Sequence, residues 1–190
     1  MVEQDELNRY ERRAGQWYRW QSVARDFILA ANYLLDWHDP PLMEGDPADL
    51  TWTHQGPAPM MVLYAIAVEN LLKAILVAQG ASIVSDGKLA ATFKHHRLAQ
   101  HAEAAGVVMT ADERDLLTRL GDMIEAGKYP VATAPGRSPG AWRFSYPTDV
   151  DRTFAMLERL EDSLRATGKP CLPRADLRRR YRPPGYSVGE

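Results

Sequence analysis

Cysteine is almost absent from this chain of 190 residues, which contains only Cys171. One cysteine excludes an internal disulfide framework and a cysteine-rich metal site, and it is typical of a reducing, intracellular compartment. No apolar run approaches the roughly 18 residues of a membrane span, and the N-terminal stretch MVEQDELNRYERR lacks the apolar core of a secretory signal. We therefore expect a soluble, cytoplasmic protein.

A dominant charge is also missing, because 23 basic residues stand against 25 acidic ones and the formal net charge is −2. This balance, with 45% hydrophobic residues, is typical of a globular domain and does not by itself indicate a nucleic-acid-binding protein. The histidines form no H-E-x-x-H motif. His96 and His101 lie about 140° apart around a helix, so they do not converge on one ion. We expect no metal site and no cofactor.

Helical periodicity dominates what the chain does contain. Apolar residues recur every three or four positions over residues 5–37, which predicts one long amphipathic helix that stops near Asp36, before Pro40-Pro41. A second helix is predicted at about residues 58–79. It closes at Gly80 and is apolar over more than half of its circumference.

Three further helices complete the predicted fold. A capping box of Thr110 and Glu113 opens the clearest of them. No convincing strand pair is present, and Ser85-Asp86-Gly87 indicates a turn. The predicted fold class is therefore all-α, an antiparallel bundle of four to five helices with long loops in residues 1–168, followed by a basic tail at 169–190 that contains prolines and is extended or disordered. The three helices are expected at roughly 96–105, from Thr110 to Gly127, and from Thr148 to a stop at Gly168.

A charged pair lies in the most apolar predicted helix. Glu69 and Lys73 are four residues apart in AVENLLKAILVAQG and so share a helix face. On an exposed face such a pair contributes only about 0.3–0.5 kcal/mol. In a helix this apolar, we expect at least one of them in a cleft or at a subunit interface. The pair is then either a salt bridge that fixes packing, or a polar site in which Lys73 meets a phosphate and Glu69 orients it.

Three short motifs follow one another along the chain. Glu69 and Lys73 lie in AIAVENLLKAIL, His96-Arg97-Leu98 comes next, and Lys128-Tyr129-Pro130 ends the fourth predicted helix. This order resembles the HEPN superfamily of helical bundles over roughly residues 15–165. In that superfamily a glutamate with a lysine four positions on, a histidine-any-leucine segment, and a basic residue with tyrosine and proline typically follow in this order. The resemblance implies ligand-binding roles for Glu69, Lys73, His96, Lys128 and Tyr129.

HEPN proteins include metal-independent ribonucleases of toxin and defence systems, partners of nucleotidyltransferases, and members that only bind nucleotide or RNA. The ribonucleases carry an arginine, four to six residues and then a histidine on the final helices, and this motif is missing here. Arg97 and His101 come nearest, with three residues between them, and remain as catalytic candidates. With Lys94 they predict a small basic surface, which either contacts phosphate or is a solvated helix face.

The resemblance thus implies an HEPN-like homodimer with a nucleotide- or RNA-related binding or regulatory role, in a toxin–antitoxin or defence setting. One alternative is a divergent, metal-independent endoribonuclease, in which a histidine acts as acid or base and an arginine stabilises phosphate charge. The other is a non-catalytic interaction protein, a scaffold or antitoxin-like dimer. The densest basic cluster, in the tail, suits phosphate contacts or a solubilising end. It consists of Arg178, Arg179, Arg180 and Arg182.

Overall fold

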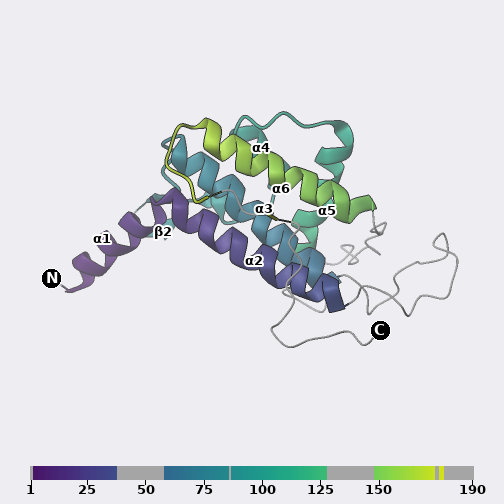
Figure 1. The fold of residues 1–190 in the computed structure, drawn as a ribbon. Coiled ribbons are helices and arrows are strands. Elements are labelled where there is room, and N and C mark those ends of the chain that lie inside the picture. The colour runs from purple at the N-terminus through teal and green to yellow at the C-terminus, as the bar shows by residue number, and fades with distance from the viewer. Residues whose placement is uncertain (1, 38–57, 86, 128–147, 174–175, 178–190) are drawn as a thin grey trace, which may run out of the picture.

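The protein is described by a computed structural model that covers residues 2–37, 58–85, 87–127, 148–173 and 176–177 (Figure 1). Within these residues the fold is all-α, as predicted, with little strand. The elements are α1 (Val2–Ala14), α2 (Trp17–Trp37), α3 (Ala58–Ala78), β1 (Val84–Ser85), β2 (Lys88–Leu89), the 3-10 turn η2 (Ala91–Phe93), α4 (Leu98–Ala104), α5 (Ala111–Gly127) and α6 (Thr148–Ala166).

Helix α3 is the centre of the hydrophobic core. It packs against α2, α4, α5 and α6, and every residue from 67 to 78 is buried. The stretch Pro59–Ala78 is long and apolar enough to cross a membrane by length and composition, but 78% of its most apolar window is buried inside the protein. That burial makes it the core helix of this fold, so its composition is only weak evidence for a membrane span.

The prediction of one continuous helix over residues 5–37 is wrong, because the chain breaks at Gly15 between α1 and α2. Glycine is about 1 kcal/mol less favourable than alanine inside a helix. The break is also held by side chains: Trp20 Nε1 donates to the carbonyl oxygen of Ala14 at 2.8 Å, and the amide oxygen of Gln16 accepts from Tyr18 Oη at 2.7 Å. Figure 1 shows α1 projecting away from the helices of the core.

The other predicted helix ends agree with the structure within about two residues. α3 and α5 each differ from the predicted bounds by one residue. Thr110 and Glu113 form the expected capping box: the Thr110 N–H donates to Glu113 Oε2 at 2.8 Å and the Glu113 N–H donates to Thr110 Oγ1 at 3.2 Å. α4 begins at Leu98 rather than at His96. His96 is therefore in the loop before α4, which frees its ring to reach α3.

A two-stranded antiparallel hairpin replaces the single predicted turn. Val84 pairs with Leu89 and Ser85 with Lys88, and Gly87 adopts a φ of 68°. The turn was predicted, but the strands were not, because two residues carry no detectable alternation. The Gly87 N–H donates to Glu11 Oε1 at 3.0 Å, so the hairpin also holds α1.

The segment after α6 returns along α2. Trp17 Nε1 donates to the carbonyl oxygen of Pro170 at 3.2 Å, the Leu172 N–H donates to Gln21 Oε1 at 3.0 Å, and Asn32 Nδ2 donates to the carbonyl oxygen of Leu177 at 2.9 Å. Leu177 belongs to the hydrophobic core. Described parts of the predicted tail therefore pack on α2, whereas its four arginines lie outside the described residues.

Candidate functional site

The charged pair predicted on the second helix is buried. Glu69 and Lys73 of α3 are 5% and 6% exposed, and Lys73 Nζ donates to Glu69 Oε1 at 2.5 Å. At this exposure the pair is not a surface salt bridge. Its formation therefore includes a desolvation cost that an exposed ion pair does not have. Both charged residues are buried in the fold of one chain, where they form a salt bridge, while a cleft or a subunit interface at this pair stays a prediction.

The second oxygen of the same carboxylate contacts His96. His96 Nδ1 lies 2.8 Å from Glu69 Oε2. The ring is half-buried and is the most exposed part of the Glu69–Lys73–His96 cluster, which we call the α3 cluster. One carboxylate therefore holds two cationic or potentially cationic groups from different parts of the chain.

Two residues that the sequence analysis did not assign to the α3 cluster help to position it. Gly121 of α5 has no side chain where the backbone of His96 passes, and a Cβ there would overlap the His96 carbonyl oxygen. Trp20 of α2 presents its ring to Lys73, with Nζ 5.5 Å from the ring centroid. A glycine inside the predicted helix 110–127 is a signal of close backbone approach, so Gly121 could have been found. Trp20 was indistinguishable from the rest of its apolar stripe.

The electrostatics of the α3 cluster favour charged Glu69. Burial by itself raises the pKa of a carboxyl, but the charge of Lys73, together with hydrogen bonds from Lys73 and His96, holds the pKa of Glu69 below its ordinary value. Glu69 therefore remains a carboxylate at neutral pH. In this arrangement Nδ1 of His96 donates a hydrogen bond to the carboxylate.

Lys73 retains hydrogen-bonding capacity. An ammonium group has three N–H donors. Among the residues that the structure describes, Glu69 accepts one hydrogen bond from this ammonium group. The ring of Trp20 also lies near its positive charge. A compact ammonium with donors to spare, beside a half-buried histidine, suits an anionic group such as phosphate.

The catalytic candidates Arg97 and His101 do not form a site. His101 is 3% exposed, and its ring stacks on that of His95 with 5.2 Å between centroids. Arg97, which precedes α4, is exposed. The prediction that His101 joins Arg97 and Lys94 in a basic surface is wrong, because the side of α4 that carries Leu98, His101 and Ala102 is buried. A ring in that position cannot reach a ribose hydroxyl.

The remaining candidates lie outside the described ranges. These are Lys128 and Tyr129 of the Lys-Tyr-Pro motif and the tail residues Arg178, Arg179, Arg180 and Arg182. For metals, the described residues contain no group of three histidine, cysteine, aspartate or glutamate side chains that could hold an ion.

A second buried carboxylate lies between α2 and α6. Arg25 donates to both oxygens of Glu161, from Nε and Nη2, at 2.8 Å each, and Gln21 Nε2 donates to Oε1 at 3.4 Å. Arg165 Nη2 reaches Oε2 at 3.3 Å and also donates to the carbonyl oxygen of Leu172 at 3.0 Å. We call Gln21, Arg25, Glu161 and Arg165 the α6 cluster. No sequence signal marked it, since 136 residues separate Arg25 from Glu161.

Comparisons of the chain with models of protein families, with curated proteins and with solved structures gave no match. The HEPN resemblance therefore rests on the sequence motifs of this chain alone. Two of its three motifs lie in described residues, and these two meet at the bond between Glu69 and His96.

Proposed function

We propose that this chain is an HEPN-like helical protein that binds a phosphate of RNA or of a nucleotide. Lys73 and His96 would contact the phosphate, and Glu69 would hold both in position. The proposal also takes over the finer arrangement that the resemblance implies: an antiparallel bundle of four to five helices with a basic tail, acting as a cytoplasmic homodimer with a binding or regulatory role.

The observation that carries the proposal is the arrangement around Lys73. Lys73 is 6% exposed, its ammonium donates to Glu69 at 2.5 Å, and no further acceptor comes from the described residues. A purely structural ion pair of this kind is often replaceable by apolar residues without loss of stability. An anion that accepts a hydrogen bond from Lys73 would use donors that the described residues leave available.

The test measures binding of a fluorescently labelled, mixed-sequence RNA oligonucleotide by anisotropy in EDTA at low salt, with ATP as a competitor. Lys73→Met removes the charge and keeps the length of the side chain. We expect it to weaken RNA binding about tenfold to a hundredfold, the equivalent of one charge-assisted hydrogen bond. The matched control is Lys169→Met, because Lys169 Nζ also lies over a tryptophan ring, 5.8 Å from the centroid of Trp17, but on the surface.

A double variant separates binding from folding. Glu69→Gln with Lys73→Met removes both charges together, so no buried charge is left without a partner. We expect this protein to fold and to bind RNA as weakly as Lys73→Met. Wild-type protein that binds neither RNA nor ATP, or a double variant that binds RNA as tightly as wild type, would contradict the proposal and leave the α3 cluster as a packing device.

The contact between Glu69 and His96 supports metal-independent RNA cleavage as a second candidate. A carboxylate 2.8 Å from Nδ1 holds the His96 ring in one orientation, and in the proposed reaction this ring takes the proton of a ribose 2′-hydroxyl. The 2′-oxygen would then bond to the adjacent phosphorus, the bond to the 5′-oxygen would break, and that oxygen would take a proton from water or from Lys73. The products would be a 2′,3′-cyclic phosphate and a 5′-hydroxyl.

Cleavage is tested with the same RNA in EDTA. Loss of cleavage in His96→Asn but not in His101→Asn would establish the ribonuclease, because the ring of His101 is buried. Intact RNA with wild-type protein would rule this candidate out and leave the binding role as it stands.

A further inference from the structure

Exposed apolar side chains gather on one helix. The described residues contain six large hydrophobic side chains that are exposed, and four of them lie on α2: Tyr18, Val23, Leu29 and Tyr33. Of the other two, Tyr10 is on α1 and Val108 is in the loop before α5. Single exposed hydrophobics need no explanation, but a row of them on one helix indicates a contact surface.

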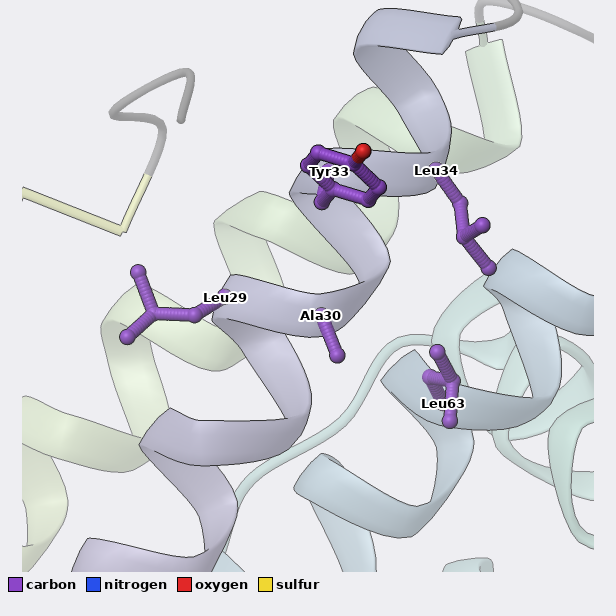
Figure 2. A pocket seen from close by; sticks show the side chains of 5 residues that line it. All are labelled: Leu29, Ala30, Tyr33, Leu34 and Leu63. Carbon is purple, nitrogen blue, oxygen red and sulfur yellow. The ribbon is translucent and has the colours of Figure 1, made fainter. Parts of the chain in front are cut away.

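The C-terminal half of this row borders an open groove of about 430 Å³ between α2 and α3. Its lining is apolar apart from the hydroxyl of Tyr33 and consists of Leu29, Ala30, Tyr33, Leu34 and Leu63. Figure 2 shows the first four projecting from α2 and Leu63 from α3, with Leu34 and Leu63 on the side where the two helices meet. Leu29, 49% exposed, stands at the rim as a projecting side chain next to a depression.

We propose that this groove is the interface between two copies of the chain, with α2 of one copy antiparallel to α2 of the other. A two-fold axis between Leu29 and Ala30 would place each Leu29 over the Ala30 of the second copy, at the groove. In such an isologous contact one surface supplies both the projecting side chain and the depression that receives it. The inference rests on the proposed homodimer and names its contact surface.

The charges of this face fit a second copy better than a charged partner. From Val23 to Tyr33 the exposed side of α2 carries one charged residue, Asp26. The same axis would bring Asp26 opposite Tyr33 of the second copy, so the charge of Asp26 would not lie directly opposite a like charge. The two Asp26 side chains would be about 10 Å apart along the helices, a distance at which salt screens most of their repulsion.

The small residue at the axis matters as well. Ala30 allows the two helix backbones to approach closely, and Leu34 and Leu63 lie beside it as the floor of the groove. A large side chain at position 30 would hold the helices apart. The proposed contact therefore needs a large side chain at Leu29, a small one at Ala30 and an aromatic ring at Tyr33.

The first experiment measures the mass of the full chain in solution by light scattering. Wild type is expected as a dimer and Leu29→Glu as a monomer at the same concentration, because a charge cannot enter the apolar groove. The matched control is Val108→Glu, which changes a more exposed hydrophobic, 88% exposed, away from α2 and should remain a dimer. A monomeric wild type, or a dimer that survives Leu29→Glu, would overturn the proposal.

A second experiment locates the axis without depending on that variant. In a Cys171→Ser background, Ala30→Cys should form a disulfide-linked dimer under mild oxidation, because residues beside a two-fold axis meet their own copies. Ser22→Cys, exposed on the same helix but two turns away, should cross-link at least about tenfold more slowly. Equal rates, or faster cross-linking at position 22, would place the contact elsewhere and refute the proposed axis. RNA binding is read separately, so failure of the dimer surface and failure of the phosphate site are distinguishable.

Discussion

The α3 cluster and the α6 cluster are both built on a buried glutamate, yet their partners differ. Glu161 is 3% exposed, and the guanidinium of Arg25 donates to both of its carboxylate oxygens. Gln21 and Arg165 also donate to this carboxylate. Glu69 has a lysine and a histidine instead. Arginine keeps its charge and matches both carboxylate oxygens, whereas lysine is a point charge and histidine changes charge near neutral pH.

That difference separates architecture from a site that can respond to a ligand. The α6 cluster ties together three segments that are far apart in sequence: α2, α6 and, through Leu172, the segment after α6. Within the described residues, Arg25 and Arg165 donate to partners in the protein, apart from Arg165 Nε, which is buried without a hydrogen-bond partner. The α3 cluster leaves donors on Lys73 and reaches the surface through His96. The predictions below test this contrast.

The largest expected effect is the loss of Glu161. Glu161→Ala leaves Arg25 and Arg165 without their shared carboxylate in a mostly buried position, and removing one partner of a buried pair costs about 3–5 kcal/mol. Urea denaturation followed by circular dichroism should show this loss in the free energy of unfolding. The exposed neighbour Asp162 serves as the control: Asp162→Ala should change stability by about 0.5 kcal/mol or less.

Replacement of Lys73 should lower the free energy of unfolding by less, and a second substitution at Glu69 should restore most of that loss. Lys73→Met leaves Glu69 buried with His96 as its partner and should lower the free energy of unfolding by about 2–3 kcal/mol. Adding Glu69→Gln should restore most of it, because no unpaired charge remains. The corresponding pair in the α6 cluster, Arg25→Met with Glu161→Gln, should stay destabilised, because Arg165 then loses the charged carboxylate that it contacts. Equal rescue in both clusters would remove the distinction between them.

A glycine pair tests how His96 is positioned. Gly121→Ala should lower the free energy of unfolding by about 1–3 kcal/mol, because its Cβ overlaps the His96 carbonyl oxygen and forces backbone shifts. It should also weaken RNA binding by moving His96 from Glu69. Gly15→Ala has no contact closer than 3.4 Å at its Cβ, so it should leave stability unchanged or raise it by up to about 1 kcal/mol. Unchanged stability and RNA binding in Gly121→Ala would show that His96 tolerates displacement.

The smallest effect is the dependence of stability on pH. The pKa values of Glu69 and Glu161 are both held below their ordinary value of 4.5 in the folded protein. The unfolded chain therefore takes up protons first as the pH falls, so these contributions are complete above the ordinary value and disappear as the pH falls through the folded values. The urea midpoint should decrease between about pH 5 and pH 3. In Glu69→Gln with Lys73→Met this decrease should be smaller than in wild type.

Local sequence patterns were sufficient for most of the helices. The ends of α3 and α5, the Thr110–Glu113 capping box and the Glu69–Lys73 salt bridge follow from short-range spacing. The break at Gly15 was missed because the apolar stripe that begins at Trp17 was extended through polar residues. The hairpin was missed because its strands are two residues long.

The α3 cluster was predicted in part. Glu69, Lys73 and His96 came from spacing and from the HEPN resemblance, while Arg97 and His101 were chosen by their proximity in sequence, which says nothing about the buried side of a short helix. A seven-residue helix is too short for its periodicity to tell which side faces the core.

The sequence by itself therefore determined the helices, their approximate ends and the pair on α3, since these depend on residues within one or two turns of each other. The tertiary structure decided which charges share a carboxylate, that Gly121 lets His96 approach, and that His101 faces inward. Those contacts join segments 25 to 140 residues apart. Their energies depend on burial and distance in three dimensions, and neither quantity is encoded in local spacing.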